Sequence, residues 1–247
     1  MTRRSRPVLI AAALAGALSG FAAGSRGPSD IPAGREGPNV SSAQAAAAPL
    51  TEKQEYLFDI IKGRRTVRDF RAIPVPKEHI LKILDMARSA PTSGNQQPWK
   101  FLVVQDRAKL DRLKIEAAAW FLTDYEKRRK PTPGELDGVR TRVAATMAKV
   151  LSAPVYVAVL TDSASPYPPD NRHDGPLAAA LLMIAARALG YGTGYYTTYF
   201  PEERMREFLN IPDRYNLVCF TPIGVPVEWP AAPAKKPLEE FVVFEKF

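Results

Sequence analysis

Residues 61–104 read IKGRRTVRDFRAIPVPKEHILKILDMARSAPTSGNQQPWKFLVV, and this stretch contains both kinds of regular structure. Apolar residues return at helical spacing before Pro91, which predicts one amphipathic helix with a buried stripe of Ile80, Ile83, Leu84 and Ala87. The run FLVVQ (101–105) is short, apolar and bounded by turn residues, as a buried strand is. We therefore expect a fold that contains both helices and strands.

The rest of the chain continues in the same way. The runs VYVAVL (155–160) and LVCFTPI (217–223) predict two more buried strands. Helical patterns cover 51–63, 107–130 and 138–152, and a very apolar helix runs from 176 to 189 and ends at Gly190. Because these elements do not alternate as regular βαβ units, we predict a single α+β domain over residues 51–247.

The composition narrows the classes of function. The 247-residue chain carries a net charge of +8, but its basic residues are scattered along helices, which disfavours nucleic-acid binding and leaves a basic pocket for an anionic ligand open. Cys219 is the only cysteine and lies in an apolar run, so we expect a small buried side chain. His79 and His173 have no partners at metal-ligand spacing, so no metal site is predicted.

The N-terminus is predicted to be a targeting segment. Residues 1–24 begin with Arg3, Arg4 and Arg6 and continue with an apolar run that is shorter than the ~20 residues of a membrane span. This pattern predicts a signal peptide with partial twin-arginine character; an uncleaved N-terminal anchor is the alternative. Residues 25–50 are rich in Pro, Gly, Ala and Ser, which predicts a disordered linker. We expect an exported or periplasmic protein, with a cytoplasmic or membrane-attached one as the alternative.

Three polar clusters interrupt the apolar framework. GRRTVRDF (63–70) contains arginine forks that suit phosphate, SGNQQPW (93–99) places amides before a rigid proline and a tryptophan, and ALGYGTGYYTTYFPEE (188–203) contains glycines that allow close backbone approach. Each has a simpler interpretation as well. An arginine-rich helix end is commonly a solvated surface, and glycines after a helix commonly form a C-cap and a turn.

In combination, these clusters resemble a known family. The stretch 61–104, AAALLMIAARALGYGT (178–193) and LNIPDRYNLVCFTPIGVP (209–226) are similar, in the correct order, to motifs of the FMN-dependent nitroreductase family, and the resemblance covers about residues 55–240. It implies a nitroreductase-like α+β fold with a mixed central sheet flanked by helices, and a homodimer with FMN at the subunit interface. It also implies electron transfer from a reduced donor, with NAD(P)H as the first candidate, to a nitroaromatic, quinone or similar acceptor.

The resemblance also implies a set of cofactor-binding residues. The phosphate and ribityl oxygens are expected at the basic cluster Arg64, Arg65, Thr66 and Arg68. The isoalloxazine is expected along Pro91, Thr92 and Ser93, and the ribityl chain and ring edge at the amides of Asn95 and Gln97. A backbone N–H near flavin N5 is expected at Thr197 or Thr198, and a second phosphate contact at Lys235 or Lys236. No side chain is predicted as a catalytic acid, base or nucleophile, because the hydride chemistry belongs to the cofactor.

The same resemblance leaves other activities open. Flavin-fragmenting and dehalogenating enzymes share this fold, and a flavin-binding protein without turnover would keep the same cofactor contacts. The segment 107–150 is predicted to form the lid that sets the substrate. It contains Tyr125, Glu126 and Lys127, but adjacent residues on a helix do not face one ligand together, so a dehalogenase lid is not favoured.

Overall fold

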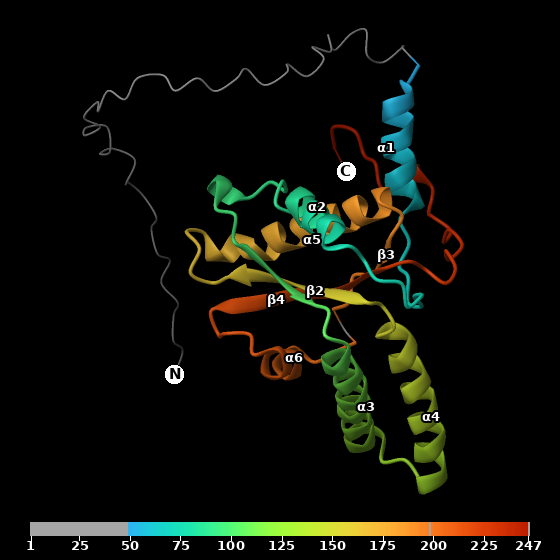
Figure 1. Ribbon diagram of the computed structural model, residues 1–247. Helices are drawn as coiled ribbons and strands as arrows, with labels where there is room; N and C mark the ends of the chain where they lie inside the picture. The colour runs from blue at the N-terminus through green and yellow to red at the C-terminus, as the bar shows by residue number, and fades with distance from the viewer. Residues whose placement is uncertain (1–48, 198, 247) are drawn as a thin grey trace, which may run out of the picture. The chain divides into compact units, whose positions relative to one another are not determined.

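The computed structural model describes residues 49–197 and 199–246 (Figure 1). The predicted signal peptide (1–24) and nearly all of the predicted linker (25–50) lie outside these residues, as does Thr198. No helix within the described part of the chain is both long and apolar enough to cross a bilayer.

The centre of the fold is a four-stranded sheet in the order β1-β2-β4-β3. Its strands are β1 (Trp99–Val104), β2 (Val155–Asp162), β3 (Gly192–Thr193) and β4 (Tyr215–Gly224). Within the described residues all four strands pair antiparallel, and the parallel pairing expected of a mixed sheet is limited to an isolated bridge between Thr66 and Thr193. The α+β prediction is confirmed, and so are the three strands that the sequence indicates.

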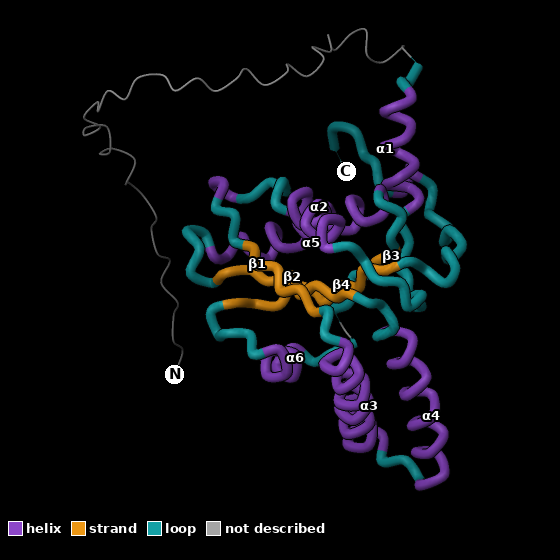
Figure 2. The backbone as a smooth tube through the Cα atoms, viewed as in Figure 1, coloured by secondary structure: helices purple, strands orange, loops and turns teal. Residues whose placement is uncertain are grey.

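Helices cover both faces of this sheet (Figure 2). One face carries α1 (Glu52–Gly63), α2 (Lys77–Ala87) and α5 (Asn171–Ala188), and the other carries α3 (Arg107–Arg129), α4 (Pro133–Val150) and α6 (Glu202–Leu209). The central strand β2 contributes side chains to the hydrophobic core on each face of the sheet. Alternate residues such as Val157 pack toward α2 and α5, while Tyr156 and its alternates pack toward α3 and α4, so the strand is buried on both sides.

Two helices begin five residues earlier than the sequence pattern predicts. In α4, Thr132 and Glu135 form a reciprocal capping box around Pro133, which starts the helix ahead of its apolar stripe. In α5, the turn before Pro176 is held against the sheet, because Asn171 Nδ2 donates to the Asp162 carbonyl at 2.8 Å. Tertiary contacts therefore extend a helix that the proline had been expected to begin.

The glycine-rich turn after α5 is a C-cap followed by close packing within the chain. Gly190 follows the helix with φ +83°, the left-handed conformation that ends many helices. A Cβ built on Gly192 would lie 2.7 Å from Val67 Cγ2 and 2.8 Å from Pro226 Cγ. The close approach predicted for this glycine is therefore made to the chain itself, next to the basic cluster.

Candidate functional site

The basic residues near the end of α1 line one cavity of about 510 Å³, which we call the basic pocket. Its polar lining consists of Arg64, Arg65, Thr66, Arg68 and Lys235, together with Lys62 at the edge. The remaining wall comes from Ile61 of α1 and from the proline-rich segment 230–233 near the C-terminus. The fold thus brings together two basic clusters that lie some 170 residues apart in the sequence.

The cations of the basic pocket have no carboxylate partners among the described residues. Arg65 Nη1 donates instead to the carbonyls of Lys62 (2.6 Å) and Arg64 (2.9 Å), and its buried Nε has no partner in this part of the chain. Arg68 Nε donates to the Tyr199 hydroxyl at 2.7 Å. Arginines on other surfaces commonly form ion pairs, as Arg107 does with Asp111. The basic pocket therefore holds uncompensated positive charge that suits an anionic ligand.

The backbone next to Arg65 and Arg68 is fixed by the glycine turn. Val67 N donates to the Thr193 carbonyl at 2.8 Å, and the Tyr196 hydroxyl donates to the Val67 carbonyl at 2.8 Å. Val67 itself is buried, so the side chains on either side of it point away from the core. These contacts hold the basic residues in place without using their charges.

The C-terminal side of the pocket is fixed by a cation–π contact. The Arg187 guanidinium lies 3.9 Å from the Trp229 ring centroid, and its Nη2 would lie 3.1 Å from a Cβ built on Gly63. Arg187 thus contacts both the end of α1 and the segment that leads to the two lysines. Lys235 lines the pocket, whereas Lys236 Nζ lies 3.0 Å from Glu240 Oε2. The structure thus gives different surroundings to two lysines that the sequence left equivalent.

The polar loop 91–97 is anchored by Gln96, a residue that the sequence analysis did not select. Gln96 Nε2 donates to Asp174 Oδ2 at 2.6 Å, and its Oε1 accepts from Tyr167 N at 2.8 Å. Asp174 is buried in the first turn of α5, where a carboxylate also complements the helix dipole. The amide between the two predicted ligands therefore holds the loop onto the protein.

The predicted amides of this loop are exposed and take no part in the anchor. Asn95 and Gln97 have left-handed φ angles of +54° and +47°, and both are exposed. Their side chains meet, with Gln97 Nε2 donating to Asn95 Oδ1 at 3.2 Å. Thr92 stabilises the turn, because its Oγ1 accepts from Gln97 N at 3.3 Å. Pro91 is exposed, and Ser93 N donates to Asp174 Oδ1 at 3.4 Å.

The basic pocket and the loop 91–97 lie at opposite ends of α5 within one chain. The loop is attached at Asp174, and the pocket is attached at Arg187, thirteen residues later. At a rise of about 1.5 Å per residue, the two attachment points are roughly 20 Å apart along the helix. A single chain therefore does not bring the predicted amides to the predicted phosphate residues.

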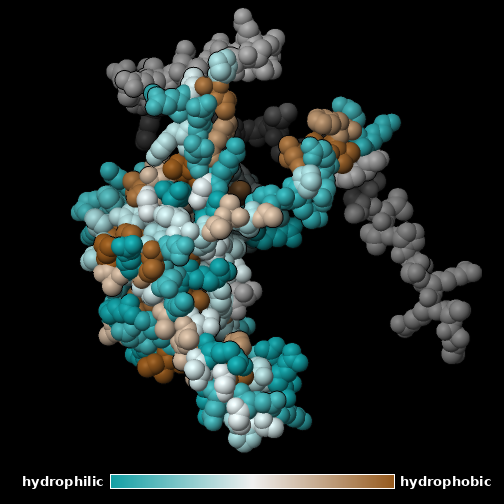
Figure 3. Space-filling view, turned by 90° about the vertical axis from the view of Figure 1, so that its right-hand side faces the viewer, coloured by the Kyte–Doolittle hydropathy of each residue, from teal (hydrophilic) through white to brown (hydrophobic). Residues whose placement is uncertain are grey.

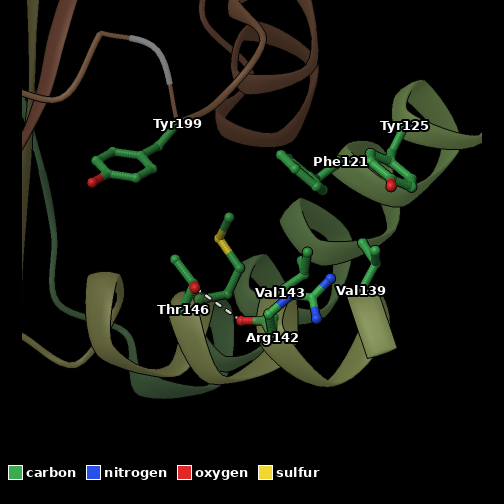
Figure 4. A pocket seen from close by; sticks show the side chains of 8 residues that line it. Phe121, Tyr125, Val139, Arg142, Val143, Thr146 and Tyr199 are labelled. Carbon is green, nitrogen blue, oxygen red and sulfur yellow. Dashed lines mark hydrogen bonds between the residues drawn. The ribbon is translucent and has the colours of Figure 1, made fainter. Parts of the chain in front are cut away.

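A second cavity, which we call the aromatic cavity, lies between α3, α4 and the turn after Tyr196. It measures about 500 Å³ and is lined by Phe121, Tyr125, Val139, Arg142, Val143, Thr146, Met147 and Tyr199 (Figure 4). Tyr125 lines this cavity, whereas its neighbours Glu126 and Lys127 are exposed and take no part in the lining. The segment 107–150 thus contributes walls to a cavity.

The remaining predicted positions add less to either cavity. Thr197 is exposed and borders a small hollow of about 40 Å³ beside Phe220; Thr198 lies outside the described residues. Cys219 is a buried free thiol, and burial raises its pKa to about 12, so it stays protonated and inert near neutral pH. Among the described residues, no cluster of three His, Cys, Asp or Glu side chains could hold a metal ion.

Comparison with known proteins identifies relatives of most of the folded part. The profile of the nitroreductase family matches residues 61–225. An iodotyrosine deiodinase from Thermotoga neapolitana is 30% identical over 173 residues, which cover 70% of this chain and 89% of the relative. A 5,6-dimethylbenzimidazole synthase from Rhodospirillum rubrum is 30% identical over 189 residues, or 71% and 84% of the two chains. The crystal structure of an oxidized iodotyrosine deiodinase bound to FMN and 3-iodo-L-tyrosine matches with a TM-score of 0.63 at 26% identity, covering 77% of this chain and all of the other.

Proposed function

The chain belongs to the nitroreductase family, and on that premise we propose that it is an FMN-dependent oxidoreductase. It takes electrons from a reduced donor, with NAD(P)H as the first candidate, and passes them to a nitroaromatic, quinone or similar small acceptor. The observation that carries this proposal is the basic pocket. Five basic side chains line it, and none has a carboxylate partner in the described residues: Lys62, Arg64, Arg65, Arg68 and Lys235. A phosphate monoester supplies the missing negative charge.

The side chains of the chain bind and orient, and FMN supplies the hydride chemistry when bound. The guanidinium forks of Arg64 and Arg65 suit the phosphate, and the Thr66 hydroxyl is placed for a further hydrogen bond. Arg68, which reaches the Tyr199 hydroxyl, carries positive charge from the pocket toward the aromatic cavity. Positive charge beside a flavin ring favours its anionic reduced form, so Arg68 is the residue that we expect to tune the cofactor.

We propose that the active form is a homodimer in which the loop 91–97 of one protomer completes the basic pocket of its partner. The distance of roughly 20 Å along α5 supports this arrangement, because the ribityl chain is bonded directly to the phosphate, so the residues that bind these two groups must be neighbours. Exposed apolar side chains support it as well. They lie on α1, at Tyr56, Leu57 and Ile61, and on the C-terminal segment, at Leu238, Phe241, Val243 and Phe244. Figure 3, which views the side where α1 lies, shows brown apolar patches on this surface.

The relatives differ in reaction, so the acceptor needs its own test. Dehalogenation, flavin fragmentation and flavin binding without turnover stay as alternatives. Dehalogenation predicts turnover of 3-iodotyrosine. Flavin fragmentation predicts oxygen-dependent loss of the flavin spectrum after reduction. The last predicts a yellow protein that dithionite bleaches and that neither NADH nor NADPH bleaches under anaerobic conditions, a result that an enzyme with another donor would share.

The decisive experiment is an FMN titration, followed by flavin fluorescence, of the wild type and two matched lysine variants. We expect Lys235→Ala to weaken FMN binding roughly tenfold or more, the value of one charge-assisted hydrogen bond. The control Lys236→Ala removes the same charge from a side chain that is paired with Glu240, so its affinity should stay near that of the wild type. A colourless protein that takes up no added FMN would overturn the proposal.

The location of the enzyme is a separate question, because the predicted signal peptide conflicts with a cytoplasmic nucleotide donor. We propose export of the folded, FMN-loaded protein through a twin-arginine route, with a donor other than NAD(P)H outside the cytoplasm. Cell fractionation combined with sequencing of the mature N-terminus tests this. An intact Met1 in a cytoplasmic fraction would contradict export.

A further inference from the structure

We propose that the aromatic cavity binds a planar aromatic molecule that carries a carboxylate or a comparable anionic group, and that Arg142 holds this group. The inference names the acceptor class for the proposed function, and it rests on that function only for the claim that the bound molecule is reduced. The binding itself follows from the cavity and is tested independently of turnover.

The shape of the cavity favours a flat ligand. Its volume of about 500 Å³ lies within the range of ~300–1,000 Å³ that is usual for small-molecule sites. Phe121 and Tyr125 form one wall, with ring centroids 6.3 Å apart and planes only 13° from parallel. Tyr199 lies on the opposite side, and apolar residues of α4, including Val143 and Met147, form the floor (Figure 4). Aromatic walls around an apolar floor suit a ring that stacks.

The charge of the cavity favours an anion. Arg142 is the only charged residue in the lining, and it has no carboxylate partner within the described part of the chain. Arg140, two residues earlier on the same helix, pairs with Asp137 at 3.2 Å. The Thr146 hydroxyl donates to the Arg142 carbonyl at 2.8 Å, so its proton is already used inside α4. The guanidinium is therefore the charged donor left for a ligand, beside the neutral hydroxyls of Tyr125 and Tyr199, and it can bind a carboxylate through two parallel hydrogen bonds.

The position of the cavity connects it to the proposed cofactor site. Tyr199 lines the aromatic cavity, and its hydroxyl accepts from Nε of Arg68, which lines the basic pocket. One pair of side chains thus separates the two cavities. A ring bound between Phe121 and Tyr199 contacts Tyr199, whose hydroxyl is bonded to Arg68, the residue that we expect to tune the cofactor. If Arg142 were merely solvated, it would have no effect on ligand preference.

The test is isothermal titration calorimetry of the FMN-loaded protein with 2-naphthoate and with its neutral analogue 2-naphthamide. We expect the wild type to prefer naphthoate roughly tenfold or more, as one charge-assisted contact provides. Arg142→Leu should abolish this preference and leave naphthamide binding unchanged, and Arg142→Lys should keep a part of it. Arg140→Leu, the matched control on the same helix, should bind both compounds as the wild type does.

Three results would overturn the proposal: no binding of either compound, equal binding of both to the wild type, or equal losses in the Arg142→Leu and Arg140→Leu variants. Reduction of 4-nitrobenzoate and 4-nitrobenzamide then separates this inference from the proposed function. Naphthoate preference without reduction of either nitro compound leaves the anion site standing and contradicts nitroaromatic reduction as the proposed reaction. Reduction of both compounds at the same kcat/KM, without naphthoate preference, contradicts the anion site alone.

Discussion

The two ends of α5 hold two polar sites that are built in opposite ways. At the amino end, the loop 91–97 is closed by hydrogen bonds, and the carboxylate of Asp174 is used by Gln96 and by a backbone N–H. At the carboxyl end, Arg187 is held by packing against Trp229 and Gly63, and its buried Nε has no hydrogen-bond partner among the described residues. One end has satisfied its polar groups internally, while the other keeps positive charge available.

This difference indicates how the proposed site is divided. A region whose polar groups are already paired can present a rigid loop, on which Asn95 and Gln97 are exposed. A region with unpaired cations needs a ligand to complete it. If two copies of the chain associate, the preformed loop of one supplies what the basic pocket of the other lacks, and each end of α5 serves a different FMN.

The largest effect that we expect is on FMN content, when the basic pocket is mutated in one protomer and the loop 91–97 in its partner. A chain with Arg64→Ala and Arg65→Ala should lose FMN, and so should a chain with Asn95→Gly and Gln97→Gly, in which glycine tolerates the left-handed backbone. Co-expressed with two affinity tags, the heterodimer of these chains should contain one intact site. Its FMN content, measured from absorbance after tandem purification, should be half that of the wild type.

The control for this experiment is a dimer of two differently tagged Arg64→Ala/Arg65→Ala chains, which should contain no FMN. A heterodimer that is equally empty would mean that both groups of residues act within one chain. A protein that sedimented as a monomer with full FMN content would contradict the proposed division of each site between two protomers.

The sequence predicts the lining of the basic pocket better than the anchor of the loop 91–97, and the reason is physical. Arg64, Arg65 and Arg68 stand next to one another, so a local motif is enough to find them, and only Lys235 needed the fold to be distinguished from Lys236. The amino end depends on Asp174, which is distant in sequence from the loop and looks like an ordinary helix-start residue. A pattern search that asked for a polar partner at that helix start could have selected Gln96.

Elements decided by tertiary contacts were also missed. The helix α6 is only eight residues long, and β3 is two residues long, so neither has enough periodicity to be recognised. The aromatic cavity escaped prediction for a related reason. Phe121 and Arg142 lie on different helices of the segment 107–150, and Tyr199 follows a third region of the chain, so no single window of sequence contains the cavity.

A smaller effect should follow from removing the anchor of the loop. Asp174→Ala leaves the amide of Gln96 and the N–H of Ser93 without their acceptor, at a cost of about 1–3 kcal/mol. Because this domain is of moderate size, we expect Tm to fall by roughly 2–4 °C for each kcal/mol in differential scanning fluorimetry. Asp170→Ala is the matched control, since that residue precedes α5 and its side chain makes no capping hydrogen bond. Equal melting of both variants would show that the loop does not depend on Asp174.

The smallest effect is a pH dependence near the amino end of α5. The hydrogen bond from Arg214 Nε at 2.7 Å lowers the pKa of Asp162 below its ordinary value of 3.8, and the Asp162 carbonyl accepts from Asn171 of α5. A carboxyl with a lowered folded-state pKa stabilises the protein fully above its unfolded pKa, and this contribution disappears as the pH falls through the folded value. Arg214→Gln should therefore lower Tm by about 1–3 °C at pH 6, as expected for an exposed ion pair.

The Tm difference between Arg214→Gln and the wild type should shrink below about pH 4, because Asp162 is protonated in the unfolded chain at a higher pH than in the folded protein. The carboxyl-end pocket relies on arginine and lysine, which stay charged over this range, so the Tm difference between Lys235→Ala and the wild type should not change between pH 6 and pH 3. Arg214 also lies 5.7 Å from the ring of Tyr215, and that contact would persist in acid. A Tm difference that is constant with pH would therefore assign the effect of Arg214 to this ring. The two ends of α5 would then not differ in their sensitivity to acid.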